Sequence, residues 1–360
     1  MKAAVCYEFG KPLVIEEINI DPPKQGEVKV KLAATAICHS DIHVFKGDLP
    51  GKLPLVGGHE SSGYVEEVGK GVTGFKKGDP VLLSLLISCG KCKYCVTGRS
   101  HMCNAVWPMD TETRMHNKKG QDLGMLFKTG SFAEYTIVDQ SQLVKIPADM
   151  PMDCASLLSC GAITGFGAVV NRAKVEPMSS CVILGVGGVG LNAIQGAAIS
   201  GANPVIAVDI ADSKLKAAKD FGATHTVNSS QGDAVKAIKD LTGGYGADYV
   251  FVTVGGVASI AQGFAMSGPR GMTVIVGLPK FTETLNLVPF MFIKDERVLT
   301  GSYMGTTQLQ TEIPKMIALY KAGKLKLDEL ITARYPLDKI NEAIEAVMNG
   351  KALRNVITFE

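Results

Sequence analysis

The sequence lacks several features that would point to an exported or nucleic-acid-binding protein. Its N-terminus, residues 1–6, runs directly into charged Glu8 and has none of the long apolar core of a secretory signal. It also lacks an excess of either charge, with 37 Lys and Arg residues against 35 Asp and Glu residues. A net charge of +2 gives no reason to expect nucleic acid or an anionic membrane as a partner. We therefore expect a cytoplasmic protein.

A membrane-spanning segment is missing as well. The most apolar stretch, residues 181–210, is interrupted by repeated glycines, by Asn192 and Gln195, and by Asn203-Pro204. A buried strand, a helix and a second buried strand explain this pattern better than a membrane span.

The chain contains 360 residues, which favours two domains, and it shows neither repeats nor low-complexity tracts. Alternating apolar and polar residues, with frequent Gly and Pro, predict mainly β structure up to about residue 150. Beyond Pro151, helical and strand patterns alternate, which predicts an α/β fold with a doubly wound parallel sheet. The expected helices cover 153–170, 191–200, 213–221, 234–241, 260–266, 312–322 and 340–349, and the expected strands 180–184, 204–209, 226–227, 247–254, 271–276 and 354–359.

A glycine-rich turn lies between the first of these strands and the helix that follows it. It reads Gly185-Val186-Gly187-Gly188-Val189-Gly190, which is G-x-G-x-x-G in the context that a dinucleotide site requires. The helix N-terminus presents free N–H groups and the positive end of its dipole to phosphates. Asp209 ends the second strand, where a carboxylate binds the ribose hydroxyls and repels a 2′-phosphate. This favours NAD over NADP. Lys214 is either a further ribose contact or a solvated helix residue.

Four of the nine cysteines crowd into one segment, as Cys89-x2-Cys92-x2-Cys95-x7-Cys103. Without an export signal, metal ligation is favoured over disulfides. Four thiolates suit a closed tetrahedral zinc site with a structural role, and an iron–sulfur cluster is the alternative. Cys38, His59 and Cys160 offer two sulfurs and a nitrogen, the open set that a catalytic zinc uses, but their spacing alone does not join them.

The chain resembles the medium-chain, zinc-dependent alcohol dehydrogenases over essentially its full length. The matching segments are Cys38-His39-Ser40-Asp41-Ile42-His43, Gly57-Gly58-His59-Glu60, the four-cysteine segment, Ser159-Cys160-Gly161-Ala162-Ile163-Thr164-Gly165, the glycine turn with Asp209, and Leu353-Arg354-Asn355-Val356-Ile357. The resemblance implies a mainly β, GroES-like catalytic domain at 1–161 and 305–360, and a Rossmann domain at 162–304.

The same resemblance implies roles for individual residues. Cys38, His59 and Cys160 would hold a catalytic zinc, giving two zinc ions per chain together with the four-cysteine site. Asp41 would orient His59, and Glu60 would approach the metal when water or substrate leaves. Ser40 would take the alcohol proton and pass it through the nicotinamide ribose to His43. The coenzyme contacts implied are His39, Thr164, Val276, Leu278, Ser302, Met304 and Arg354, besides the glycine turn, Asp209 and Lys214.

Some relatives carry Arg at the position of His39. A histidine there would bind the coenzyme pyrophosphate less firmly than an arginine, and coenzyme release would depend on pH. The expected reaction is reversible hydride transfer between an alcohol and NAD, giving an aldehyde or ketone.

The substrate is less well defined by the sequence. The resemblance places Leu85, Leu126, Phe127, Leu278 and Tyr303 on the pocket wall, which suits an aliphatic or aromatic alcohol. Residues 104–130 carry Trp107 together with Arg114, His116, Lys118 and Lys119, and would either attract an anionic substrate or form a solvated loop. The competing functions are a zinc-free reductase of the same fold, a polyol dehydrogenase, and a non-catalytic binding protein. The resemblance implies a homodimer or homotetramer, and the apolar run 285–293 before Val298 would pair across a two-fold axis.

Overall fold

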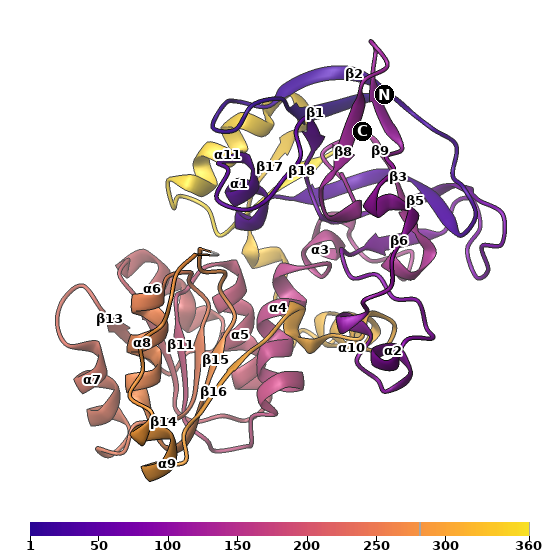
Figure 1. Ribbon diagram of the computed structural model, residues 1–360. Helices are drawn as coiled ribbons and strands as arrows, with labels where there is room; N and C mark the ends of the chain where they lie inside the picture. The colour runs from indigo at the N-terminus through magenta and orange to yellow at the C-terminus, as the bar shows by residue number, and fades with distance from the viewer. Residues whose placement is uncertain (281, 360) are drawn as a thin grey trace. The chain divides into compact units, whose positions relative to one another are not determined.

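The alternating segments near the N-terminus form strands, and the later strand–helix alternation forms a parallel sheet, in two separate parts of the chain (Figure 1). The computed structural model describes residues 1–280 and 282–359. One unit comprises Met1–Cys160, Gln308–Gly323 and Leu327–Glu360, and the other comprises Gly161–Thr307 and Lys324–Lys326. The boundaries therefore fall at 160/161 and 307/308, beside the predicted 161/162 and 304/305.

The first unit is mainly β in the part of the chain that the structure describes. A closed barrel runs in the order β1-β2-β7-β8-β4, and a sheet runs in the order β10-β6-β5-β3-β18-β17, with β9 paired to β3. The strands of this unit are β1 Lys2–Cys6, β2 Val14–Ile20, β3 Glu27–Ala36, β4 Leu55–Val56, β5 Glu60–Val68, β6 Pro80–Leu83, β7 Met115–Asn117, β8 Asp122–Met125, β9 Tyr135–Asp139, β10 Leu143–Lys145, β17 Ile331–Pro336 and β18 Arg354–Thr358.

Alternation decides which side chains of these strands are buried. In β3, Val28, Val30 and Leu32 lie in the core, whereas Lys31 between them is exposed. The C-terminal strand β18 pairs antiparallel with β3, with Val356 opposite Ala36, so the end of the chain completes the sheet that the N-terminal part begins. The helices of this unit are α1 His39–Phe45, α2 Lys93–Val96, α3 Met152–Leu157, α10 Leu309–Lys321 and α11 Ile340–Met348.

The second unit holds a parallel sheet in the order β13-β12-β11-β14-β15-β16. This is the order of a Rossmann fold, in which the chain winds outward from the first strand in both directions. Helices α4 and α5 pack together, as do α7 and α8, and Figure 1 shows the strands running between these two groups. The elements are β11 Cys181–Leu184, β12 Val205–Asp209, β13 His225–Asn228, β14 Ala247–Val252, β15 Ser267–Ile275, β16 Val298–Gly301, α4 Gly161–Gly167, α5 Gly188–Ile199, α6 Asp212–Asp220, α7 Ala234–Leu241, α8 Val257–Met266 and α9 Phe290–Lys294.

Both parts of the predicted architecture are confirmed: a Rossmann sheet and a mainly β unit. The expected helix at 153–170 is wrong in one respect, because it is broken between α3 and α4, and its end, Ala168–Ala173, is π-helical. The break leaves Cys160 outside regular helix. The short 3₁₀ turns are η1 Ser100–Met102, η2 Pro108–Asp110, η3 Leu126–Lys128, η4 Gln140–Gln142, η6 Met304–Thr306, η7 Asp328–Leu330 and η8 Leu337–Lys339.

No helix in the described ranges has both the length and the apolar character that a bilayer crossing requires. The apolar stretch 181–210 forms β11, α5 and β12, as the interruptions in its sequence predict.

Candidate functional site

Cys38 lies at the junction between β3 and α1, where it is the N-cap of the helix. Asp41, the third residue of α1, accepts a hydrogen bond from the Cys38 N–H at 3.1 Å through Oδ2. The Asp41 N–H in turn donates to the Cys38 carbonyl at 3.1 Å. This reciprocal pair resembles a capping box and fixes the backbone that carries the Cys38 thiol.

The other carboxylate oxygen of Asp41 binds a second segment of the chain, Gly58-His59. Its Oδ1 accepts hydrogen bonds from the Gly58 N–H at 3.0 Å and from Nδ1 of His59 at 2.9 Å. Gly58 has a φ of +88°, and a Cβ there would lie 2.8 Å from the backbone nitrogen of Phe132, so a larger residue would displace this segment. Asp41, His59 and the Cys38 thiol are all buried.

One ring nitrogen of His59, Nδ1, thus forms a hydrogen bond with a carboxylate, and the other, Nε2, does not. Nε2 of His59 is buried and has no hydrogen-bond partner among the described residues. Donor atoms of Cys38, His59, Glu60 and Cys160 all lie within 4.8 Å of one another. Two sulfurs, one imidazole nitrogen and a nearby carboxylate are a donor set that suits zinc, and an otherwise unpaired Nε2 is the atom that would bind it.

The two thiols of this cluster share a hydrogen bond. A hydrogen bond with Cys160 holds the pKa of the Cys38 thiol well below its usual value, and the same bond, together with burial, raises the pKa of Cys160. Two adjacent buried thiols do not both ionise readily unless a cation lies beside them, because like charges repel strongly away from water. Cys160 itself follows α3 at the helix break, where the Ser84 hydroxyl donates to the carbonyl of Ser159 at 2.8 Å.

Glu60 forms a buried ion pair with the guanidinium of Arg354. Burial raises the pKa of Glu60 to about 7, although the Arg354 charge opposes this rise. Oε1 of Glu60 has no hydrogen-bond partner among the described residues. Arg354, expected from the resemblance to contact a coenzyme phosphate, therefore holds the carboxylate beside the thiols in this structure, and sequence patterns gave no sign of that pairing.

An aromatic side chain covers one side of His59. The Phe127 ring packs edge-on against the imidazole, with 5.1 Å between the ring centroids, and 37% of Phe127 is exposed. Phe127 and Lys128 have φ values of 51° and 59°, a left-handed conformation that costs energy for residues other than glycine. Leu126 is buried and Leu85 half-buried in the same unit. These three apolar residues of the expected pocket wall thus belong to the unit that carries the thiols.

The residues expected to move a proton lie on α1. Ser40 is half-buried, and His43 follows three residues later, so both lie on the same side of the helix. Nδ1 of His43 lies 3.0 Å from Oδ2 of Asp48, and 41% of the His43 side chain is exposed. His39, the first residue of the helix, is exposed.

The four clustered cysteines also come together, with their sulfurs within 4.8 Å of one another. They are all free thiols, and the Cys92 and Cys95 sulfurs lie 3.5 Å apart. The N–H groups of Cys89 and Cys92 donate to the sulfurs of Cys103 and Cys89, each at 3.3 Å. Hydrogen bonds from backbone N–H groups lower the pKa of Cys92 to about 6, which favours a thiolate. Four sulfurs with N–H support suit a closed zinc site.

The glycine turn of the second unit has the geometry that phosphate binding requires. A Cβ on Gly190 would lie 1.9 Å from the carbonyl oxygen of Gly185, so the helix α5 approaches the strand as closely as only glycine permits. A Cβ on Gly187 would meet nothing within 4 Å, which leaves its backbone open to a ligand. Gly188 and Val189 then begin α5 and present its N-terminal N–H groups.

Asp209 ends β12 beside this turn. Its Oδ2 accepts a hydrogen bond from the Val186 N–H at 2.7 Å, and its Oδ1 accepts from the N–H groups of Ile210 and Ala211 at 2.8 Å and 3.1 Å. The carboxylate is buried and fixed by these three backbone donors. The turn and the acidic residue thus form one preorganised unit, which suits the ribose and pyrophosphate of a dinucleotide.

The remaining expected coenzyme contacts of the second unit are found near the ends of its strands and helices. Val276 is buried just after β15, and Leu278, which is 51% exposed, follows it. Ser302 follows β16 and has a buried hydroxyl without a partner among the described residues. The Thr164 hydroxyl donates to the sulfur of Met304 at 3.7 Å. The exposed pocket candidate Tyr303 also belongs to this unit, and Lys214 is half-buried on α6.

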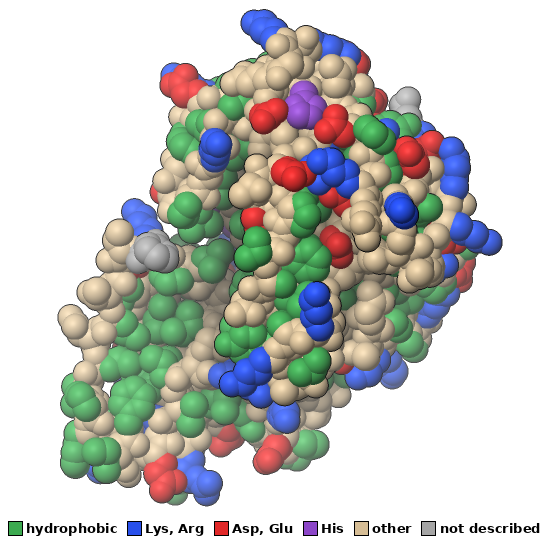
Figure 2. Space-filling model, turned by 45° about the vertical axis from the view of Figure 1, so that its right-hand side comes forward, with side chains coloured by type: hydrophobic (Ala, Val, Ile, Leu, Met, Phe, Trp, Pro, Cys, Tyr) green, Lys and Arg blue, Asp and Glu red, His purple; other side chains and the backbone are tan. Residues whose placement is uncertain are grey.

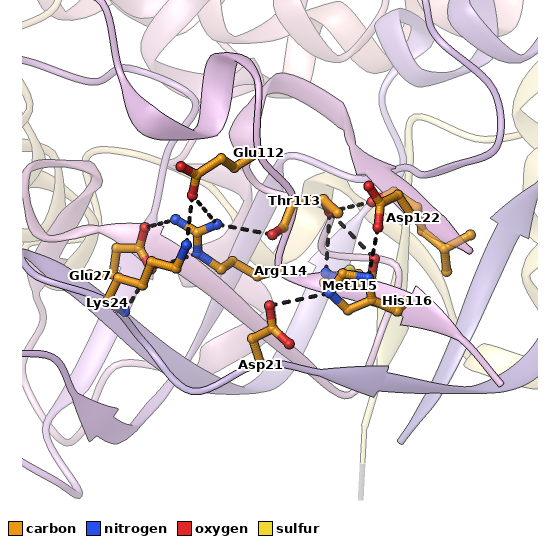
Figure 3. A network of polar contacts seen from close by, with 10 residues as sticks. Asp21, Lys24, Glu27, Glu112, Thr113, Arg114, Met115, His116 and Asp122 are labelled. Carbon is orange, nitrogen blue, oxygen red and sulfur yellow. Dashed lines mark hydrogen bonds and ion pairs between the residues drawn. The ribbon is translucent and has the colours of Figure 1, made fainter. Parts of the chain in front are cut away.

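Several basic residues of the segment 104–130 are paired within the protein, and Figure 3 shows the contacts of Arg114 and His116. Arg114 is buried and binds Glu27 with two hydrogen bonds of 2.6 and 2.9 Å, and Glu112 with a third of 2.9 Å. His116 lies between Asp21 and Asp122. Lys118 donates to Asn19 at 3.0 Å. The charges that suggested an anionic substrate are mostly taken up by the protein itself, so this segment gives that idea little support.

Two family models match the chain. The alcohol dehydrogenase GroES-like domain matches residues 24–148, and the zinc-binding dehydrogenase family matches residues 188–322. An NDMA-dependent alcohol dehydrogenase from Amycolatopsis methanolica is 39% identical over 365 residues, which cover 99% of this chain and 98% of the relative.

Solved structures of similar proteins cover the whole chain. An alcohol dehydrogenase zinc-binding domain protein from Burkholderia ambifaria has a TM-score of 0.95 at 35% identity, covering 100% of this chain and 98% of the other. Benzyl alcohol dehydrogenase from Acinetobacter calcoaceticus has a TM-score of 0.93 at 34% identity, covering 100% and 99%.

Proposed function

Because the chain belongs to the medium-chain, zinc-dependent alcohol dehydrogenase family, we propose that it transfers hydride reversibly between a hydrophobic alcohol and NAD at a zinc held by Cys38, His59 and Cys160. That it is an oxidoreductase acting on alcohols follows from its full-length relatives. The observation that carries the zinc site is the buried Nε2 of His59, which has no partner among the described residues, on a side chain that has a ring nitrogen within 4.8 Å of two thiol sulfurs.

A zinc ion at this site supplies Lewis acidity, which lowers the pKa of an alcohol or polarises a carbonyl group. The protein's own part is to hold three donors in place. Asp41 fixes the Cys38 backbone and the tautomer of His59, so that Nδ1 carries the proton and Nε2 is free to bind. Glu60 supplies a nearby carboxylate whose charge Arg354 balances.

Proton transfer is assigned to α1. The Ser40 hydroxyl would accept the alcohol proton, and His43, with its exposed imidazole, would release it to solvent. Asp48 would orient the His43 ring through Nδ1. The helix keeps the two side chains one turn apart.

The coenzyme we propose is NAD, and the support comes from the second unit. The open backbone at Gly187 and the fixed carboxylate of Asp209 suit a nicotinamide dinucleotide with a free ribose 2′-hydroxyl. The nicotinamide ring would accept the hydride. One relative depends on NDMA, so the coenzyme assay needs NAD, NADP and NDMA as separate arms.

We infer the substrate class from apolar side chains of the unit that carries the proposed metal ligands. Phe127 covers His59 with a half-exposed ring, and Leu126 and Leu85 are purely hydrocarbon. Such walls favour an aliphatic or aromatic alcohol over a polyol or an acid. A structural neighbour acts on benzyl alcohol, which makes benzyl alcohol the first substrate to try.

The experiment combines metal analysis with turnover. We expect about two zinc ions per chain and benzyl alcohol-dependent reduction of NAD, with one zinc lost in Cys38→Ser. A matched control is Cys6→Ser, which removes a buried thiol outside both clusters. Full activity in zinc-free protein would overturn the proposal, and activity with NDMA but no NAD reduction would overturn its coenzyme assignment.

We also propose that two copies associate through the edge of the parallel sheet. β16 is the last strand in the sheet order, and Val288, Phe290 and Ile293 before it are each more than half exposed. Figure 2 shows hydrophobic side chains gathered at the lower left. Exposed apolar patches mark association surfaces. Light scattering of Ile293→Lys should report a smaller species than the parent protein, and an unchanged mass would contradict this assignment.

A further inference from the structure

A second carboxylate lies beside Asp209 at the carboxyl end of the parallel sheet. Asp209 ends β12 and is paired in register with Asn228, which ends β13. Nδ2 of Asn228 donates to Oδ1 of Asp212 at 2.6 Å. Asp212 is the first residue of α6 and is exposed. Since neighbouring strands lie about 4.8 Å apart, this chain of contacts places both carboxylates at one edge of the sheet.

The Asp212 carboxylate is held in position by side-chain amides. Nε2 of Gln231 donates to its Oδ2 at 3.4 Å. The orientation of the Asn228 amide is set by Ser230, whose N–H and hydroxyl both donate to the Asn228 Oδ1, at 2.9 and 2.6 Å. With its oxygen occupied in this way, Asn228 presents its NH₂ group to Asp212. A surface carboxylate with a prepared amide partner is more fixed than an ordinary solvated one.

Neither carboxylate has a cationic hydrogen-bond partner among the described residues. In residues 1–280 and 282–359, the hydrogen-bond donors on Asp209 are three backbone N–H groups, and those on Asp212 are the amides of Asn228 and Gln231. Lys214, two residues after Asp212 on α6, contributes one positive charge to the same end of the helix.

We propose that Asp212 is a second determinant of coenzyme choice, which excludes NADP independently of Asp209. This inference rests on the proposed use of NAD. A 2′-phosphate carries about 1.5 to 2 negative charges near pH 7 and would approach both carboxylates. When Asp209 alone is replaced, the opposite charges of Asp212 and Lys214 still offset each other, so the site gains no attraction for the phosphate. With both removed, Lys214 leaves a net positive charge.

A purely structural role for Asp212 predicts something different. An acidic residue in the first turn stabilises a helix through its dipole, and this effect does not depend on a 2′-phosphate. Repulsion of the phosphate, by contrast, is screened by salt with a Debye length of about 10 Å at 0.1 M. The ratio of NADPH to NADH affinity, measured against ionic strength, therefore separates the two roles.

The experiment measures Kd for NADH and NADPH by fluorescence titration of the full-length protein. The proteins are the parent, Asp209→Ser, Asp212→Asn, the double variant, and Asp220→Asn as the matched control. Asp220 ends the same helix, so its substitution makes the same charge change at the opposite end. Circular dichroism checks that each variant is folded, and binding of 2′-AMP against 5′-AMP tests the ribose end of the site alone.

We expect Asp209→Ser alone to leave NADH preferred, and the added Asp212→Asn change to improve NADPH binding by about tenfold relative to NADH. Rising salt should help NADPH binding to the parent and weaken it in the double variant. The role of Asp212 would be overturned if the double variant had the same ratio of NADPH to NADH affinity as Asp209→Ser. It would also be overturned if NADPH binding to these two variants had the same salt dependence. A parent protein that binds neither NADH nor NADPH would instead overturn the proposed coenzyme, and this inference with it.

Discussion

The carboxylate of Asp41 lies 2.9 Å from Nδ1 of His59, and both side chains are buried. The same carboxylate binds the backbone N–H of Cys38 through its other oxygen. One acidic side chain thus positions two segments that lie 21 residues apart in the chain, each carrying a donor for the proposed catalytic zinc.

Replacing Asp41 should therefore weaken the metal site more than the fold. Asp41→Asn keeps the shape but loses the charge-assisted bond to His59, and we expect a 10- to 100-fold loss in zinc affinity or turnover, as for other carboxylates behind metal-bound His. Competition with a chelator measures the affinity. Asp122→Asn is the matched control, because Asp122 Oδ1 binds Nδ1 of His116 at the same 2.9 Å away from any thiol cluster. Equal effects of the two substitutions would contradict the assignment.

Ser40 offers a direct test of proton transfer. Ser40→Ala removes the only group that we assign to accept the alcohol proton, and turnover should fall by about 10²- to 10⁴-fold while NADH binding is unchanged. Ser40→Thr keeps a hydroxyl on the same backbone and should restore much of the activity. If Ser40→Ala and Ser40→Thr have the same turnover, the Ser40 hydroxyl has no part in proton transfer.

The buried pair of Arg114 and Glu27 makes a prediction about stability. Arg114→Met would leave the Glu27 carboxylate buried without its partner, which should lower the free energy of unfolding by about 3–5 kcal/mol. Replacing both residues, as Glu27→Leu with Arg114→Met, removes the unpaired charge and should recover part of that loss. Urea denaturation of the parent, the single variant and the double variant checks this. A double variant less stable than Arg114→Met would argue against an unpaired charge as the cause.

Stability toward acid should depend on Glu112. Hydrogen bonds from Lys24 and Arg114 hold the pKa of Glu112 below its usual 4.5 in the folded protein. The unfolded chain therefore takes up this proton first as the pH falls, so the stabilisation from Glu112 is present above pH 4.5 and is lost as the pH drops through the lower, folded-state pKa. Glu112→Gln should flatten the fall of the melting temperature below pH 4.5. An identical slope in the variant would show that Glu112 contributes nothing.

Much of the fold follows from local patterns in the chain. The alternation of β3, the glycine turn and the strand that ends at Asp209 each leave a signal within about ten residues, and their predicted positions agree with the structure. The helix expected at 153–170 is different. Its apolar spacing continues through residues 158–160, so periodicity alone gives no reason to end α3 before Cys160.

The candidate metal sites show the same contrast. Cys89, Cys92, Cys95 and Cys103 are close in sequence, so spacing alone predicts that they meet. Cys38, His59 and Cys160 are brought together by long-range strand pairing and by Asp41, and only the family resemblance joined them beforehand. The pair formed by Glu60 and Arg354 spans 294 residues, a separation that no local pattern reports.

The most direct test of the account compares zinc content and turnover in Cys160→Ser. This substitution removes one buried sulfur donor of the proposed catalytic site and leaves the four-cysteine cluster intact. We predict that zinc falls from about two ions to about one per chain, and that alcohol-dependent reduction of NAD is lost while NADH still binds. A Cys160→Ser protein that retains both zinc ions and oxidises alcohol at the parent's rate would contradict the central claim.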